Sequence, residues 1–191
     1  MKERPILFRG PMVRAILEGR KTQTRRVVKD TGLYAIEERF HGKETADREK
    51  HNLATQCKYG ISGDHLWVKE THQAHPIYGS PVYKADYQTD NNPVKIEGWP
   101  WRPSIFMPRK SSRITLEITD VRVERLQDIS EEDAMSEGVD VSEYIECIKP
   151  PHMEPCRSAK RAYSSLWEEI NGPGSWEANP WVWPITFKRI K

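Results

Sequence analysis

Hydrophobic residues recur with helical spacing in two segments of the chain. In residues 11–18, apolar side chains stand four positions apart, which places them on one face of a helix, and Gly19 follows where that helix would end. In residues 158–171 the same spacing continues over more turns, and a Gly-Pro-Gly sequence comes directly after it. The apolar residues of this second segment are Ala159, Ala162, Tyr163, Leu166, Trp167 and Ile170. We therefore predict two amphipathic helices.

Short runs of apolar and β-branched residues predict the strands of a sheet. These runs cover residues 4–8, 65–71, 81–86, 112–121 and 181–187. Alternation in the second run puts Leu66, Val68 and Glu70 on one face. If that face is the core, the Glu70 carboxylate must be paired or protonated, because an isolated buried charge is too costly. Pro184, inside the last run, is typical of an edge strand or a bulge.

A short acidic helix is predicted between Ser130 and Gly138. Ser130 suits the N-cap, three acidic residues suit the first turn, and Gly138 suits the end. Glu137 falls in the last turn, where the helix dipole disfavours a carboxylate and so raises its pKa. Such a group can donate a proton, but a glutamate that faces solvent fits the same pattern.

The composition fits a single α+β domain over residues 1–191. The chain has a mass of 22.3 kDa, 37% hydrophobic residues, seven tryptophans and seven tyrosines, so it can bury a substantial core beside several polar loops. Residues 30–62 and 139–157 lose hydrophobic periodicity, and we interpret them as exposed insertions.

Charge and hydropathy exclude several classes of protein. The net charge of +2 does not by itself indicate a phosphate-binding face. No apolar run approaches the roughly 20 residues that cross a bilayer, and the first residues lack the apolar core of a signal peptide. We therefore expect a cytoplasmic protein without membrane association.

The three cysteines indicate neither a disulfide framework nor a metal site. Their number is odd and they are widely spaced, which favours reduced thiols. Cys147, His152 and Cys156 match no strong zinc pattern, and Cys57 is distant from them in sequence. We expect no metal and no cofactor.

One segment concentrates positive charge without any carboxylate. Residues 19–26, Gly-Arg-Lys-Thr-Gln-Thr-Arg-Arg, join the first predicted helix to an extended stretch. In a regular strand Lys21 and Thr24 would point to opposite faces, so they can share a pocket only if Lys21 lies on the turn and Thr24 at the start of the strand. The arginines can lower the pKa of Lys21 or hold a phosphate, although a basic turn is most often a solvated face.

The run from Ile16 to Arg25 resembles the signature of the ASCH domain, a PUA-like β-barrel family, and in particular that of the small bacterial N4-acetylcytidine amidohydrolases. The resemblance implies a mixed β-barrel with flanking helices and long loop insertions. It also implies that Lys21 is the proton acceptor and Thr24 the nucleophile. From sequence order and flanking residues, it implies that Glu137 is the proton donor. Glu70 is a rival for this carboxylate role.

The chain also departs from these relatives in length. Three further stretches resemble the family, at residues 112–121, 126–138 and 183–188. Compared with the compact amidohydrolases, however, the chain adds residues 30–62, 72–110 and 139–157. Loops of that size can reshape the mouth of a barrel and change its substrate.

Three functions are compatible with these features. The first is an amidohydrolase that acts on N4-acylated cytidine or a related modified nucleoside. The second is a PUA-like module that binds RNA or a modified base without turnover. The third is an ASCH-type ribonuclease, in which a neutral lysine activates a ribose hydroxyl.

Binding to a nucleoside or to RNA needs cations for phosphate and aromatic rings for bases. The candidate binding residues are Arg20, Arg25, Arg26, Glu70, Trp67, Trp99, Trp101 and Arg102. The tryptophan-rich segment around residues 99–110 fits equally well as a rigid, proline-held loop that caps the core.

Overall fold

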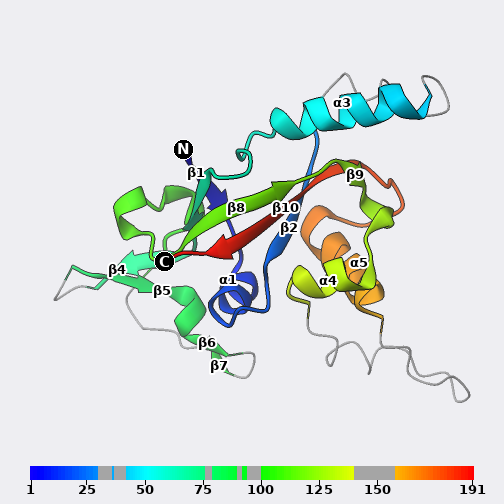
Figure 1. The fold of residues 1–191 in the computed structure, drawn as a ribbon. Helices are drawn as coiled ribbons and strands as arrows, with labels where there is room; N and C mark the ends of the chain where they lie inside the picture. Colours follow the sequence, from blue (N-terminus) through cyan, green and yellow to red (C-terminus); the bar gives the residue numbers. More distant parts are fainter. Residues whose placement is uncertain (30–35, 37–41, 76–78, 90–91, 94–99, 140–157) are drawn as a thin grey trace, which may run out of the picture.

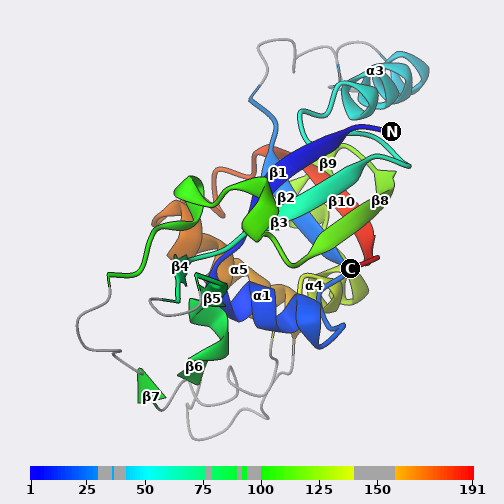
Figure 2. The ribbon, with the colours of Figure 1, turned by 90° about the vertical axis from the view of Figure 1, so that its left-hand side faces the viewer.

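The computed structural model describes residues 1–29, 36, 42–75, 79–89, 92–93, 100–139 and 158–191. It has an α+β architecture, in which a six-stranded mixed sheet is flanked by helices (Figures 1 and 2). The strands of this sheet are β1 (Glu3–Leu7), β2 (Gln23–Val27), β3 (His65–Lys69), β8 (Thr115–Val121), β9 (Glu124–Arg125) and β10 (Trp181–Arg189).

The α-helices in these ranges are α1 (Gly10–Leu17), α3 (Lys43–Thr55), α4 (Glu131–Ser136) and α5 (Ala159–Asn171). None of them has the length and apolarity needed to cross a membrane. Smaller elements are β4 (His72–Ala74), β5 (Pro81–Tyr83), β6 (Gln88–Thr89), β7 (Asn92–Pro93) and the 3-10 helices η2 (Lys84–Asp86), η3 (Ser104–Phe106), η4 (Arg109–Ser111) and η5 (Leu126–Asp128).

The sheet order is β1-β3-β8-β10-β2, with β9 also paired to β10. β1 and β3 run parallel, and the other pairs are antiparallel. Because β10 pairs with β2, Ile185 lies opposite Thr24 and Pro184 opposite Arg25. The second half of the basic segment, residues 23–26, therefore lies in an outer strand that is held in register by the last strand of the sheet.

The described strands do not form the closed barrel that the resemblance implies. β1 and β2 are the two outer strands of the sheet and share no ladder. A side chain spans the gap between them: Arg26 Nη2 donates to the Leu7 carbonyl at 2.9 Å, and the guanidinium lies 5.3 Å from the centre of the Phe8 ring. The mixed α+β class holds for the described residues, but closure through backbone pairing does not.

Two apolar clusters hold the elements together. The first includes Ile6, Val13, Ile16, Leu66, Leu116, Ile118 and Ile185, from the sheet and α1. The second includes Leu126, Ile129, Ala134, Ala159, Tyr163, Trp167 and Val182, from η5 and its C-cap, α4, α5 and β10. In Figure 1, β2 accordingly lies beside α4 and α5, with α1 at its N-terminal end.

Within the exposed insertion predicted over residues 30–62, residues 43–55 form the helix α3, which the hydrophobic pattern did not indicate. This helix buries only Ala46 and Leu53, two turns apart, and most of its other side chains are charged or polar. Two apolar positions are too few to give a periodic pattern. Its C-terminal end is held from the sheet, where Trp183 Nε1 donates to the Leu53 carbonyl at 3.1 Å.

Pro184 is not on an edge strand, because β10 pairs with strands on both sides. The ladder between β10 and β9 ends at Val182, and the ladder between β10 and β8 begins at Ile185. Pro184 therefore falls between the two ladders, where its missing N–H interrupts neither of them. A register shift does occur, but between Thr186 and Phe187. The strand predicted at 81–86 is also shorter than expected, because β5 gives way to η2.

Candidate active site

The site is organised around a buried contact between Lys21 and Glu137. Lys21 Nζ donates to Glu137 Oε2 at 2.7 Å and to the Glu137 carbonyl oxygen at 2.7 Å. Lys21 is 2% exposed and Glu137 is 4% exposed, so water hardly reaches the pair. The two residues also form an isolated antiparallel bridge through their backbones. Glu137 is therefore a buried partner of Lys21 and does not face solvent.

Local structure brings Lys21 to this position. Gly19, with φ +78°, ends α1, and the Lys21 N–H then donates to the Ala15 carbonyl at 3.0 Å. Lys21 thus lies on the turn before β2, and Thr24 is the second residue of that strand. This is the arrangement that the sequence requires for the two side chains to serve one site.

The other half of the contact depends on the end of α4. The Ser130 hydroxyl caps the helix by accepting from Asp133 N at 3.0 Å, and Glu137 is the C-cap. Gly138 follows with φ +80°, and a Cβ there would lie 2.8 Å from Lys21 Cβ. Only glycine suits this position, because it allows both the left-handed backbone and the close approach.

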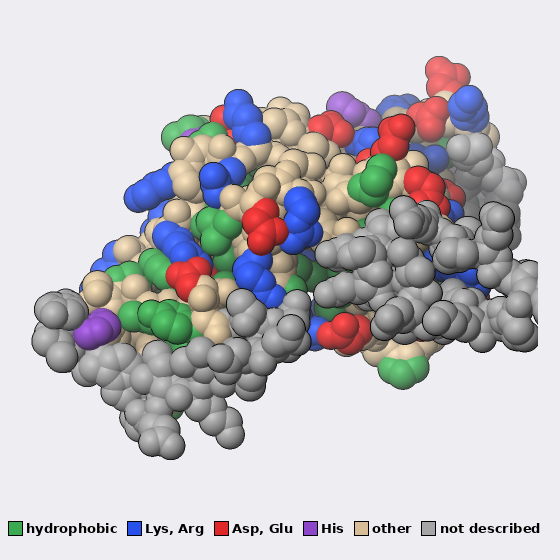
Figure 3. All heavy atoms as spheres, turned by 90° about the horizontal axis from the view of Figure 1, so that it is seen from below, with side chains coloured by type: hydrophobic (Ala, Val, Ile, Leu, Met, Phe, Trp, Pro, Cys, Tyr) green, Lys and Arg blue, Asp and Glu red, His purple; other side chains and the backbone are tan. Residues whose placement is uncertain are grey.

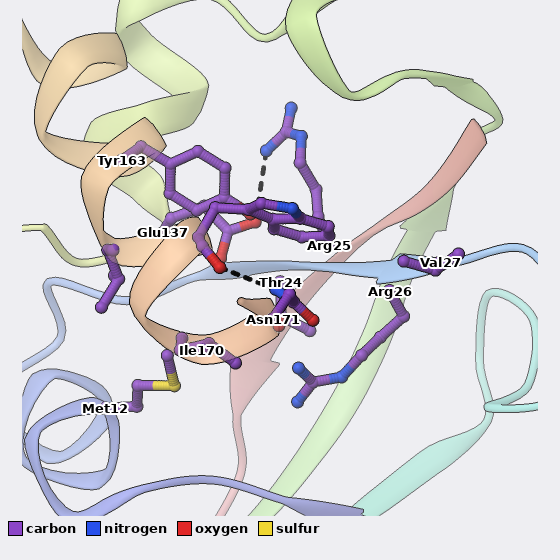
Figure 4. A pocket seen from close by; sticks show the side chains of 11 residues that line it. Met12, Thr24, Arg25, Arg26, Val27, Glu137, Tyr163, Ile170 and Asn171 are labelled. Carbon is purple, nitrogen blue, oxygen red and sulfur yellow. Dashed lines mark hydrogen bonds and ion pairs between the residues drawn. The ribbon is translucent and has the colours of Figure 1, made fainter. Parts of the chain in front are cut away.

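Thr24 lines a small open pocket of about 70 Å³ beside the Glu137 carboxylate (Figure 4). The wall is completed by Met12, Arg25, Arg26, Val27, Tyr163, Leu166, Trp167, Ile170 and Asn171. No hydrogen bond between the Thr24 hydroxyl and another described residue is present. A cavity that holds benzene has about 150 Å³, so this pocket admits a small group but not a whole base.

Arg25 is the most heavily paired side chain of the site. Its side chain is fully buried and contacts three carboxylates: Glu124 at 2.7 Å, Asp133 at 2.8 Å and Glu137 at 3.3 Å. The guanidinium also lies 6.0 Å from the centre of the Tyr163 ring. Figure 4 shows Glu137 directed toward Arg25, with Tyr163 beside them. Arg25 is therefore committed to internal ion pairs and is not available to a substrate.

Burial changes the proton affinities of the site. Burial lowers the pKa of Lys21 below the ordinary value of 10.5; the Glu137 carboxylate opposes this change, and Arg26 and Arg25 add to it. For Tyr163, burial and the negative charge of Glu137 raise the pKa well above its ordinary range. The site thus combines a lysine that gives up its proton more easily with a tyrosine that keeps its own.

Glu70, the rival carboxylate, lies in a different cluster. It is buried with Leu66 and Val68, as the alternation predicts, but it pairs with Arg113 at 2.9 and 3.0 Å. Arg113 in turn pairs with Asp86 at 2.8 Å. The prediction that a buried Glu70 needs a partner is confirmed, and that partner is Arg113 rather than Lys21.

The remaining candidates lie at several places. Arg20 is exposed and pairs with Glu18, whereas Arg26 lines the pocket. Trp67 lies on the outer face of β3, with the Lys69 and Arg109 cations near its ring. Trp101 packs beside Tyr87, and Arg102 bridges to His72 through the backbone. Trp99 lies outside the described residues. The structure brings none of Trp67, Trp101 and Arg102 to the pocket wall.

No family model, curated protein or solved structure matches the chain.

Metal binding finds no support in the described residues. They contain no cluster of three or more histidine, cysteine, aspartate or glutamate side chains that fits an ion. Cys57 is a buried thiol, and burial raises its pKa. Cys147, His152 and Cys156 lie outside the described residues.

The sequence did not reveal the groups that surround Arg25. Glu124, Asp133 and Tyr163 come from β9, α4 and α5, and no spacing links them to the basic segment. One signal was available: residues 19–26 contain no carboxylate, so any of their cations that is buried must find its counter-charges elsewhere in the chain.

Proposed function

We propose that the protein is a metal-independent amidohydrolase that removes the acyl group from N4-acylated cytidine or a related modified nucleoside. The observation that carries this proposal is the buried 2.7 Å contact between Lys21 and Glu137 beside the pocket that Thr24 lines. We also assign the chain to the PUA-like ASCH fold within this proposal. The ASCH-like basic segment and the mixed sheet support that assignment, although the described strands leave the barrel open.

The lysine–glutamate pair can supply both a base and an acid. Moving one proton from Lys21 Nζ to Glu137 converts two buried charges into a neutral amine and a neutral carboxylic acid. Burial favours the neutral forms, and the two atoms are already at hydrogen-bonding distance. The amine can then accept a proton, and the acid can donate one.

The acylation step uses both groups. The Thr24 hydroxyl oxygen attacks the acyl carbon, and its proton moves to Lys21. The carbon–nitrogen bond then breaks, and the leaving amino group of the base takes the proton of Glu137. The products are a Thr24 ester, a free base, and the Lys21 ammonium beside the Glu137 carboxylate. Hydrolysis of the ester then starts from this charged pair.

Hydrolysis of the ester reverses the roles. Water attacks the ester carbon and gives a proton to the Glu137 carboxylate. The carbon–oxygen bond to Thr24 breaks, and the Thr24 oxygen takes a proton from Lys21. The acid leaves, and the neutral pair is restored.

The pocket size limits what lies inside it. A volume of about 70 Å³ suits a short acyl group with its carbonyl, and the cytosine ring would remain at the mouth. Met12, Leu166 and Ile170 supply the apolar wall that such a group needs.

The direct test is incubation of the purified protein with N4-acetylcytidine, with cytidine and acetate followed by chromatography. We expect release of both products in equal amounts, without added metal and in the presence of a chelator. An acetylated lysine peptide serves as the control amide and should stay intact. Absence of turnover with N4-acetylcytidine and with other N4-acylated cytosines would remove the proposal.

The pH dependence of kcat/KM gives a second prediction. The competent pair holds one proton, so the profile should be bell-shaped, with two apparent pKa values that belong to the pair. Because burial lowers the pKa of Lys21, activity should fall on the alkaline side below pH 10.5, the ordinary lysine value. An alkaline limb at or above that pH would contradict the role of Lys21.

A second candidate is a binding module without turnover. Arg26 lines the pocket, and its guanidinium forms no ion pair with another described residue, so it can attract an anionic group such as a phosphate. On the face shown in Figure 3, however, positive and negative side chains are interspersed rather than gathered into one basic field. RNA affinity that falls steeply with salt, without hydrolysis, would favour this candidate.

A further inference from the structure

We propose that Arg25 is a positioning residue that sets the proton affinity of the Lys21–Glu137 pair, and that Asp133 and Glu124 control its influence by balancing its charge. The proposal rests on the proposed hydrolytic function for its effect on activity. Its physical content, the coupling of two outer carboxylates to a buried lysine, can be measured without turnover.

The first observation is a row of alternating charges that runs from the surface to the buried lysine. Arg122 contacts Asp133 at 2.9 Å, and the same carboxylate oxygen contacts Arg25 at 2.8 Å. Arg25 then contacts Glu137 Oε1 at 3.3 Å, and Glu137 Oε2 contacts Lys21 at 2.7 Å. Each charge in this row has an opposite charge as its neighbour.

The second observation is how the row is anchored. Arg25 makes its third ion pair with Glu124, through Nε at 3.2 Å and Nη2 at 2.7 Å. It also donates to the Gln23 side chain, and Gln23 in turn donates to Asp133 at 3.1 Å. The position of the guanidinium is therefore fixed from several sides, and Glu137 is held with one oxygen toward Arg25 and the other toward Lys21.

Electrostatics gives the direction of the coupling. Arg25 disfavours a positive charge on Lys21 and favours a negative charge on Glu137, so alone it would lower the proton affinity of both groups. The carboxylates of Asp133 and Glu124 oppose that effect, because each places a negative charge against the Arg25 guanidinium. If one of them is neutralised, Arg25 acts on the pair with less compensation, and both apparent pKa values of the pair should fall.

The charged and titratable groups that face the pair are few in the described part of the chain. Lys21 is faced by Glu137, Arg25 and Arg26. Glu137 is faced by Lys21, Arg25 and Tyr163. Asp133 and Glu124 act on the pair through Arg25, and Arg122 lies on their outer side, 2.9 Å from Asp133 and 3.9 Å from Glu124.

The outer carboxylates offer a better test than Arg25 itself. The Arg25 side chain is fully buried, and its removal would leave the Glu137 carboxylate with less compensation in the interior, so the fold itself would be at risk. The side chains of Asp133 and Glu124 are 23% and 20% exposed, so the amide substitutions D133N and E124Q keep their shapes where water can relieve the change.

The experiment compares pH profiles of kcat/KM for N4-acetylcytidine. We expect D133N and E124Q each to move both limbs of the profile to lower pH by about one unit, which corresponds to about a tenfold change in the proton concentration at half-maximal activity. The matched control is Glu132→Gln, an exposed acid on the same helix next to Asp133. It should leave both limbs unchanged. Thermal unfolding of every variant shows whether the fold is kept.

A second measurement does not depend on turnover. The 13Cε resonance of Lys21, assigned by its loss in Lys21→Arg, reports protonation of the amine directly. Its titration should move to lower pH in D133N and E124Q and stay in place in E132Q. If wild-type protein shows no hydrolysis but this shift is seen, the proposed function fails and the coupling stands. If both outer variants lose activity equally at every pH and the Lys21 titration does not move, the coupling is overturned.

Discussion

Replacing Thr24 with valine is expected to lower kcat/KM for N4-acetylcytidine by at least about 1,000-fold, while the unfolding temperature changes little. Loss of a nucleophile removes the covalent step, and comparable substitutions in other enzymes lower the catalytic rate by several orders of magnitude. Valine has nearly the shape of threonine, and among described residues no hydrogen bond to the Thr24 hydroxyl would be lost. The loss should therefore appear in the chemistry and not in the fold.

The same segment provides the control for this prediction. Thr22 stands two residues earlier and is exposed, whereas Thr24 is 2% exposed and lines the pocket. Thr22→Val should retain wild-type activity. Intact-mass analysis of quenched reactions should show one added acyl group in wild-type protein and none in Thr24→Val. Full activity of Thr24→Val would assign the attack to water and would end the role of Thr24 as nucleophile.

The sequence predicted where the two halves of the site lie, but only the resemblance connected them. The turn at Gly19 and the cap at Ser130 are local features, and both form where the residues indicate. The contact between Lys21 and Glu137 joins residues 116 positions apart. Local patterns carry no information on such a pairing, because it depends on how α4 packs against the start of β2.

Local sequence patterns also failed to predict three other features of the structure, each for a different physical reason. The helix α3 has two buried apolar positions and so lacked a periodic signal. Pro184 indicated an edge strand, because proline has no N–H to donate to a ladder. In the structure it lies in the middle of the sheet, at the gap between the β9 and β8 ladders of β10, and neither ladder needs its N–H there. The sequence did not indicate that Arg25 forms ion pairs, because the carboxylates that pair with it are distant in the sequence.

Glu70 shows how far a physical argument from sequence can reach. Alternation over the predicted strand at residues 65–71 placed its carboxylate in the core, and the cost of a buried charge required a partner. Both expectations are confirmed. The identity of the partner, Arg113, was not predictable, because 43 residues separate the two and no spacing rule links the segments that carry them, one just after β3 and one just before β8.

Arg113→Met is expected to destabilise the protein by about 3 kcal/mol near pH 7, measured by urea unfolding. Removal of one partner of a buried ion pair typically costs this much, because the other charge stays buried without compensation. Glu70 is 1% exposed and loses two charge-assisted hydrogen bonds. Methionine keeps an apolar stem against Tyr83, whose ring centre lies 4.0 Å from the guanidinium. The matched control is Arg109→Met, whose two-bond pair with Glu3 is exposed, so its loss should change stability little.

The destabilisation of Arg113→Met should depend on pH in a defined direction. Burial already raises the pKa of Glu70 above its ordinary value of 4.5, against the effect of Arg113, and loss of the guanidinium raises it further. A raised pKa in the folded state means that the folded protein keeps the proton longer than the unfolded chain. Below pH 4.5 the carboxyl becomes protonated in both states, and the variant should approach wild-type stability. As pH rises toward the folded-state pKa the deficit should grow, and it should become constant above that pKa. A deficit that is equal at acidic and neutral pH would show that lost packing, rather than an unpaired carboxylate, causes the destabilisation.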